Sequence, residues 1–105
     1  MTTPTRSDAK PRIPLRTLLT VVSDPTRWRI FENLQRHGGT PAAVLAERLG
    51  VPVSNISKHL SVLLKAGMLE RGLGRLYKIP EAFQIPGERT LDFGAVTLRL
   101  DQGKL

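Results

Sequence analysis

The sequence predicts a mainly α-helical domain that ends in short β-strands. Apolar residues recur at helical spacing from Leu15 to Leu64, and the pattern changes to alternation between apolar and polar residues after Gly67. The chain of 105 residues has the length of one domain, and 40% of its residues are hydrophobic. It can therefore bury a modest core, to which a dimer interface would add.

Two helices are expected in the first third of the chain, after a polar segment at residues 1–13 that we interpret as a flexible tail. The second of these helices begins at Pro25, a residue that suits a first helical position. Ser23 or Asp24 can cap it by accepting a backbone N–H bond. The first helix is expected over residues 14–22, with one apolar stripe made of Leu15, Leu18, Leu19 and Val22.

The next unit, residues 40–67, predicts two short helices joined by a tight turn. Thr40 can cap the first helix, Pro41 suits its first position, and Gly50 ends it because glycine tolerates a positive φ. Pro52 can open the second helix. An apolar back and a small, polar front are what a helix–turn–helix needs in the helix that enters a DNA groove. The apolar side consists of Val53, Ile56, Leu60, Leu63 and Leu64, and the polar side of Ser54, Asn55, Lys58, Ser61 and Lys65.

The segment after Gly67 predicts a β-hairpin. The centre of this hairpin is Gly72-Leu73-Gly74, and apolar residues flank it on both sides. A two-stranded ribbon that directly follows a recognition helix is a wing. Arg71 and Arg75 would lie near its tip, with Lys78 further along, where basic side chains can reach phosphates.

The last part of the chain, from Thr90 to Leu100, is interpreted as an extra C-terminal strand. Its apolar residues alternate in one phase before Gly94-Ala95 and in the opposite phase after it, which suits a β-bulge or a bend. A helix is the alternative, but the β-branched and aromatic residues and Gly94 disfavour it. The predicted fold is therefore a winged helix–turn–helix, mainly α with a small β wing and this additional strand.

The charge of the chain points to a polyanionic partner. The net charge is +7 and the pI is about 10.9. Residues 51–80 hold five basic residues against the single acidic residue Glu70. Because the chain has no cysteine, disulfides, thiolate metal sites and a cysteine nucleophile are excluded. No apolar run reaches the length of a membrane span, so we expect a cytoplasmic protein that does not bind a membrane.

Two stretches of the sequence resemble one bacterial family. SDPTRWRIFENL at residues 23–34 and VLAERLGVPVSNISKHLSVLLKAGMLE at residues 44–70 are similar to the ArsR-type winged-helix repressors. The resemblance spans about residues 15–80 and implies a homodimer that binds operator DNA and leaves it when an effector, often a metal ion, binds. Metal sensors of this family use Cys pairs or sets of His, Asp and Glu. Here Cys is absent and the histidines are His37 and His59, so no metal site or cofactor is expected, and the sequence names no effector.

These observations together assign candidate roles to two sets of residues. Ser57 and His59 match positions of the family motif, and the other DNA-binding candidates lie on the polar helix side or the wing. The predicted domains are the tail at 1–13, the DNA-binding unit at 14–80 and a dimerising extension at 81–105. The DNA-binding candidates are Ser54, Asn55, Ser57, Lys58, His59, Arg71, Arg75 and Lys78. The dimerisation candidates are Leu15, Leu18, Leu19, Val22, Leu91, Phe93, Val96 and Leu98.

The functional prediction is a sequence-specific DNA-binding regulator, namely a homodimeric repressor of a pseudo-palindromic operator. The alternative is a winged-helix module that binds a protein or RNA without operator specificity. An enzyme is not expected, because the carboxylates are scattered and no nucleophile, base and phosphate-binding loop occur together.

Overall fold

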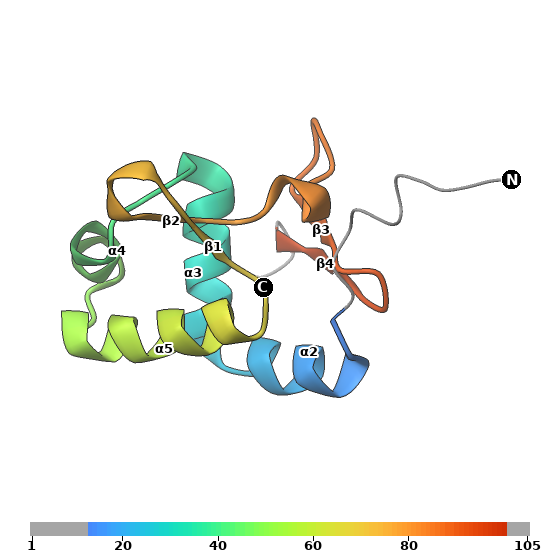
Figure 1. The fold of residues 1–105 in the computed structure, drawn as a ribbon, viewed down its shortest axis with the longest axis horizontal. Helices are drawn as coiled ribbons and strands as arrows, with labels where there is room; N and C mark the ends of the chain where they lie inside the picture. The colour runs from blue at the N-terminus through green and yellow to red at the C-terminus, as the bar shows by residue number, and fades with distance from the viewer. Residues whose placement is uncertain (1–12, 101–105) are drawn as a thin grey trace, which may run out of the picture.

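The computed structural model describes residues 13–100 of the chain. Within this range it has four α-helices followed by two antiparallel β-hairpins (Figure 1). This arrangement confirms the predicted winged helix–turn–helix. The expected tail lies outside the described residues except for Ile13, which is buried in the core and therefore not part of a tail. The elements are α2 (Leu15–Val22), α3 (Pro25–His37), α4 (Ala42–Leu49), α5 (Val53–Lys65), β1 (Glu70–Gly72), β2 (Leu76–Lys78), β3 (Thr90–Asp92) and β4 (Thr97–Arg99).

A single hydrophobic core joins the helices to the second hairpin. Helix α3 runs through the middle of the molecule, with α4 on one side and the β3–β4 hairpin on the other (Figure 1). Its buried Phe31 meets Phe93 edge-on at 6.0 Å between ring centroids, and Phe93 also packs against Phe83 at 4.7 Å. The helix–turn–helix therefore rests on a core to which the C-terminal segment contributes.

The start of α3 follows the prediction from sequence. The Asp24 carboxylate accepts hydrogen bonds from the backbone N–H groups of Thr26 at 2.7 Å and Arg27 at 3.1 Å. Pro25 is the first residue of the helix. The cap and the proline together set where α3 begins, and so fix the sharp change of direction after α2.

The turn between α4 and α5 also follows the prediction, but the start of α4 does not. Gly50 ends α4 in the left-handed conformation, with φ 69° and ψ 34°. Thr40 does not cap α4: its hydroxyl donates to the Gly38 carbonyl at 2.9 Å. Its backbone instead pairs with Tyr77 through two hydrogen bonds of 3.0 and 2.9 Å. Pro41 is the residue before the helix and has no side-chain cap.

The apolar face of α2 is turned relative to the prediction, whereas the apolar side of α5 is confirmed except at its first residue. In α2 the buried residues are Leu18 and Val21, whereas Leu15 and Leu19 are 49% and 56% exposed. Val21 lies one turn after Leu18, so these two share the side that faces α3. In α5 the buried residues are Ile56, Leu60 and Leu63, whereas Val53 in the first turn is 49% exposed.

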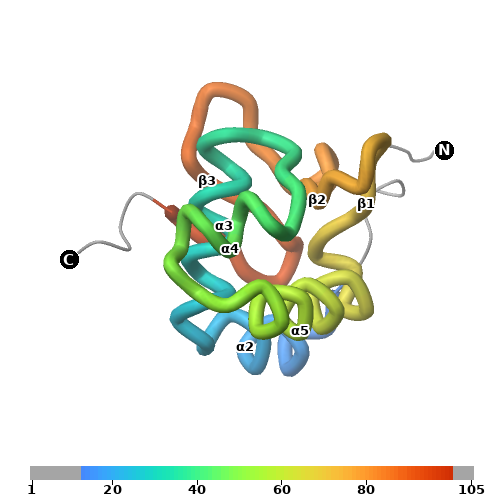
Figure 2. The backbone as a smooth tube through the Cα atoms, turned by 90° about the vertical axis from the view of Figure 1, so that its left-hand side faces the viewer, coloured from blue at the N-terminus to red at the C-terminus, as the bar shows by residue number. Residues whose placement is uncertain are grey.

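The wing forms as predicted. Strands β1 and β2 are antiparallel, and the residue pairs run from Glu70 opposite Lys78 to Gly72 opposite Leu76. The tip is a 3₁₀ turn at Leu73–Arg75 in which Gly74 has φ 74° and Arg75 has φ 61°. Figure 2 shows this hairpin at one edge of the molecule with its tip turned away from the helices.

The C-terminal segment is a hairpin rather than the single strand that we expected. Strands β3 and β4 pair in antiparallel register, with Leu91 opposite Leu98. The change of phase at Gly94-Ala95 is a turn, in which Gly94 has φ 94° and the Phe93 N–H donates to the Val96 carbonyl at 2.9 Å. Reversal of the chain lets both apolar sets face the same core, which a regular strand without a bulge could not do.

Candidate nucleic-acid interface

The outer side of α5 carries four of the predicted DNA-binding residues. Ser54, Asn55, Ser57 and Lys58 are all exposed in the first half of the helix. None of their side chains makes a hydrogen bond or ion pair with another residue in the range 13–100. The buried residues of α5 hold the helix on α4 and the core, so this polar side faces outward. The packing of the buried side fixes the position of α5. Amide, hydroxyl and ammonium groups that are exposed on such a helix can bind base edges or phosphates.

His59 lies apart from this outer set. It is half-buried, and its Nδ1 lies 3.4 Å from the Arg27 guanidinium, so the ring faces α3. Arg27 in turn donates from Nε to the carbonyl of Val21 at 2.8 Å. His59 thus links the recognition helix to the junction between α2 and α3.

The charge of Asp24 at this junction depends on the same contacts. Burial alone would raise the pKa of the Asp24 carboxyl. The backbone hydrogen bonds from Arg27 and Thr26 outweigh that effect, with attraction from His59 and Arg27 adding to them, and the pKa lies below its usual value. The junction therefore favours an ionised cap at the start of α3.

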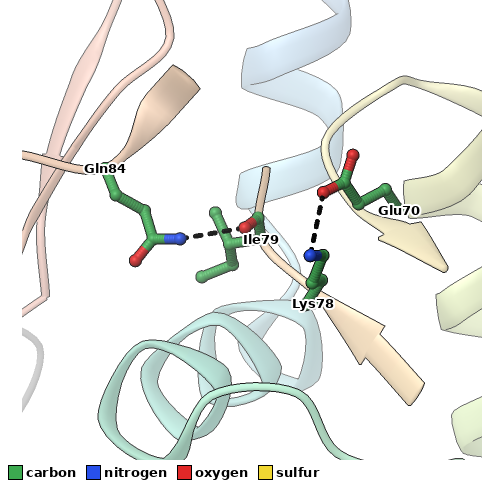
Figure 3. Close-up of polar contacts among 4 residues, drawn as sticks. All are labelled: Glu70, Lys78, Ile79 and Gln84. Carbon is green, nitrogen blue, oxygen red and sulfur yellow. Dashed lines mark hydrogen bonds and ion pairs between the residues drawn. The ribbon is translucent and has the colours of Figure 1, made fainter. Parts of the chain in front are cut away.

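The basic residues of the wing differ in how firmly they are held. Arg71 lies over the Tyr77 ring at 5.3 Å and donates to its hydroxyl at 3.2 Å. Lys78 forms an exposed ion pair with Glu70 at 3.7 Å (Figure 3). Arg75 is exposed and makes no side-chain contact of this kind with the rest of residues 13–100. Of the three, Arg75 is the most available to a phosphate, while Lys78 would have to leave Glu70.

The connection from the wing to the C-terminal hairpin is also fixed. The Gln84 side-chain amide donates to the Ile79 carbonyl at 2.9 Å, beside the Glu70–Lys78 pair (Figure 3). Ile79 is buried. Because one end of β2 is tied to the core in this way, the base of the wing has a defined position.

The dimerisation candidates fall into three groups by burial. Leu18, Leu91, Phe93 and Leu98 are buried inside one protomer, so their expected place on a dimer surface needs correction: the core of the monomer takes them up. Val22 and Val96 are half-buried. The exposed members are Leu15 and Leu19, one helical turn apart on α2.

Two residues near the site were not predicted from the sequence. Arg29 donates to the carbonyl of Leu49 at 2.9 Å and so braces the end of α4 from α3. Leu73 at the wing tip is 94% exposed. The position of Leu73 between two glycines at the centre of a hairpin could have indicated that its side chain is exposed. The same pattern also occurs in ordinary turns. Nothing in the local sequence marks the contact of Arg29, because its partner is a backbone carbonyl 20 residues away.

The elements described above coincide with one known domain type. Residues 22–72 match a helix-turn-helix domain family. That stretch runs from the end of α2 to the end of β1 and contains every residue of the outer side of α5. The matched family is related to the ArsR-type regulators, and a domain of this kind suggests a DNA-binding regulator. No curated protein matches the chain.

Two other kinds of site can be assessed for the described part of the chain. Among residues 13–100, no helix is long and apolar enough to cross a membrane. The same residues contain no group of three or more His, Asp or Glu side chains placed to hold a metal ion.

Proposed function

We propose that the protein is a sequence-specific transcriptional regulator, and that it acts as a homodimeric repressor of a pseudo-palindromic operator. The observation that carries this proposal is the outer side of α5, where Ser54, Asn55, Ser57 and Lys58 are exposed and have no side-chain partner among residues 13–100. The buried side of the helix holds it on the core. The helix-turn-helix match over the same elements supports it.

Each of these side chains has a chemical partner in the major groove or on its border. Asn55 can bind adenine with two hydrogen bonds, and Lys58 can donate to the O6 and N7 atoms of guanine or to a phosphate. Ser54 and Ser57 are short enough to let the helix approach and can bind phosphate oxygens. The N-terminal half of a recognition helix is the part that meets base edges in this motif.

The wing and α2 supply the other two parts of the proposal. Arg75 at the wing tip is free to bind the phosphate backbone and so to set the position of α5. The exposed pair Leu15 and Leu19 offers an apolar surface through which a second copy can pack. Two copies related by a two-fold axis would read half-sites about one helical turn apart.

The test compares single substitutions on α5 by fluorescence anisotropy with duplexes that the protein retains from a random-sequence pool. Asn55→Ala and Lys58→Ala should each cost about 1–3 kcal/mol on the retained sequence and relax the preference at one base pair. Lys65→Ala is the matched control, because it removes the same charge from the exposed last turn of the same helix. Its effect should be smaller and independent of sequence.

The outcome that contradicts the proposal is equally clear. If Asn55→Ala and Lys58→Ala both retain the affinity and sequence preference of the unmodified protein, α5 does not read DNA in this way. If the protein retains no duplex at moderate salt, a DNA-binding function is wrong as a whole.

A further inference from the structure

One arginine side chain joins three helices of the protein. Arg27 belongs to the first turn of α3. Its Nε donates to the carbonyl of Val21 in the last turn of α2 at 2.8 Å, and a terminal nitrogen lies 3.4 Å from Nδ1 of His59 in α5. Helix α2 carries the exposed apolar pair of the proposed dimer, and α5 carries the side proposed to read DNA. Arg27 therefore lies between the two surfaces that the proposed function needs.

Both contacts suit the chemistry of a guanidinium. The last carbonyls of a helix have no partner within the helix, and a cation is favourable near them. Helix α2 has no basic residue in its own last turn, so Arg27 supplies that cation from α3. In the second contact, Nδ1 of a neutral His59 ring must be the acceptor, because a guanidinium has donors only. Each contact thus has a defined direction.

The same guanidinium also fixes its two partners relative to each other. It is planar and rigid, so a shift of one partner disturbs the bond to the other. Val21 is buried, and Arg27 and His59 are half-buried, so water competes little for these bonds. Figure 1 shows α2 and α5 along one edge of the molecule. A lysine, which is a single point charge, could bind one of these partners but not hold both.

We propose that Arg27 is a positioning residue that fixes the angle between α2 and α5, and so sets the separation of the two α5 helices in the proposed dimer. A rotation of about 10° at this junction moves a point about 20 Å away by about 3.5 Å, which is close to the rise of one base pair. The junction therefore determines which separation of half-sites one dimer can bind at once. The inference rests on the proposed function and names what sets its choice of operators.

The first test measures the separation of the two α5 helices without DNA. Because the chain has no cysteine, Ser61→Cys gives one spin label per protomer at an exposed position of α5. Double electron–electron resonance on this labelled protein should give one narrow distance distribution. Adding Arg27→Lys should broaden it. Arg29→Lys is the matched control and should leave it narrow, because the Arg29 guanidinium donates to the carbonyl of Leu49 in α4.

The second test measures the choice of half-site separation. Duplexes with two copies of a retained half-site are compared at several separations, beside a duplex with a single half-site. The unmodified protein should lose about tenfold in affinity one base pair away from its best separation, because a dimer that cannot reach both half-sites loses avidity. In Arg27→Lys this loss should shrink to about threefold or less, while single half-site binding stays within about twofold. Arg29→Lys should keep the full loss.

Variants of His59 test the contact itself. His59→Leu removes the acceptor and should weaken the separation preference in the same way as Arg27→Lys. His59→Asn keeps an oxygen near the place of Nδ1 and should restore most of the preference. The double variant with Arg27→Lys and His59→Leu should lose no more than either single variant, because both changes remove one shared contact.

Three results would overturn the inference. One is an unchanged distance distribution in Arg27→Lys, and another is an unchanged preference for separation. The third is equal weakening on every duplex, the single half-site included, which loss of folded protein alone would produce. These results leave the proposed function intact. If the unmodified protein binds no duplex, or if its labels give no distance between two copies, the inference is wrong together with the proposed regulator or the proposed dimer.

Discussion

At the scale of single residues, Asp24 is the residue on which the start of α3 depends. Its carboxylate accepts two backbone N–H bonds, and Arg27 and His59 stand near it. An N-terminal cap of this kind is typically worth about 1 kcal/mol. Its contribution should depend on pH, because the native pKa lies below the usual value.

We predict that Asp24→Ala lowers the free energy of unfolding by about 1 kcal/mol at neutral pH, and that Asp24→Asn, which keeps a capping oxygen, costs less. A carboxyl with a lowered native pKa stabilises the fold fully above its unfolded pKa of about 4, and this contribution is lost as the pH falls through the native value. Urea unfolding followed by the fluorescence of Trp28, the only tryptophan, measures this. A stability difference between the unmodified protein and the Asp24→Asn variant that does not shrink in acid would contradict the argument.

Single residues at the helix ends also show which structural roles could be predicted from the sequence. Pro25 and Gly50 were placed correctly, and Asp24 is the one of the two predicted cap candidates, Ser23 and Asp24, that caps α3. Caps and left-handed glycines can be predicted because they act on the backbone within a few residues. Thr40 was not placed correctly, although it has the chemistry of a cap. The backbone of Thr40 forms a β-bridge with Tyr77, which is remote in sequence. The residues next to Thr40 in the sequence do not indicate such a partner.

At the scale of elements, the C-terminal hairpin carries more of the structure than its short strands suggest. Phe93 lies between Phe31 of α3 and Phe83 and is almost fully buried. Leu91 and Leu98 face the same core from opposite strands. A truncation near Pro86 would therefore remove part of the monomer core and could not report on dimerisation alone.

We predict that Phe93→Ala costs about 3–5 kcal/mol of unfolding free energy, which is a large share of the total stability of a small domain. Phe93→Leu should cost clearly less, because it keeps most of the apolar volume. Thr97→Ala, at an exposed position of β4, is the control and should stay within about 0.5 kcal/mol. Equal midpoints for Phe93→Ala and Thr97→Ala in urea would show that the hairpin is not part of the cooperative core.

The elements also show where sequence patterns are informative. The helices and the wing were recognised because their apolar spacing and their Gly and Pro boundaries agree. The second hairpin was interpreted as one bent strand. A bent strand and a hairpin both give the same alternation of apolar and polar residues on either side of Gly94-Ala95. What distinguishes them is whether Leu91 and Leu98 face each other, and that depends on packing against α3.

At the scale of the whole molecule, α2 carries the exposed apolar pair on which the proposed dimer would pack. It lies at an edge of the molecule, away from α4 (Figure 1). Leu15 and Leu19 of this helix are 49% and 56% exposed. The burial of Leu18, Leu91, Phe93 and Leu98 within the protomer leaves this pair as the main apolar surface among the residues we expected at the dimer interface.

We predict that Leu19→Glu shifts the protein to the monomer in sedimentation experiments, because a buried unpaired carboxylate is unfavourable in a dimer interface. Thr20→Glu is the matched control: it adds the same charge at the neighbouring exposed position. Circular dichroism should be unchanged in both. Should Leu19→Glu sediment like Thr20→Glu, the dimer, if formed, uses another surface.

The pairing of Thr40 with Tyr77 has a consequence for the choice of DNA sites. It fastens the wing to the segment that enters α4, and α4 in turn packs against α5. In the proposed complex, the wing and α5 would therefore keep one spacing on the duplex. The bases met by α5 and the stretch met by the wing tip must then stand at one set distance. An operator lengthened by a single base pair between them would turn the second contact by about 34° around the helix axis, at about 10.5 base pairs per turn, and lose it. We therefore expect the proposed regulator to tolerate substitutions in its site better than insertions.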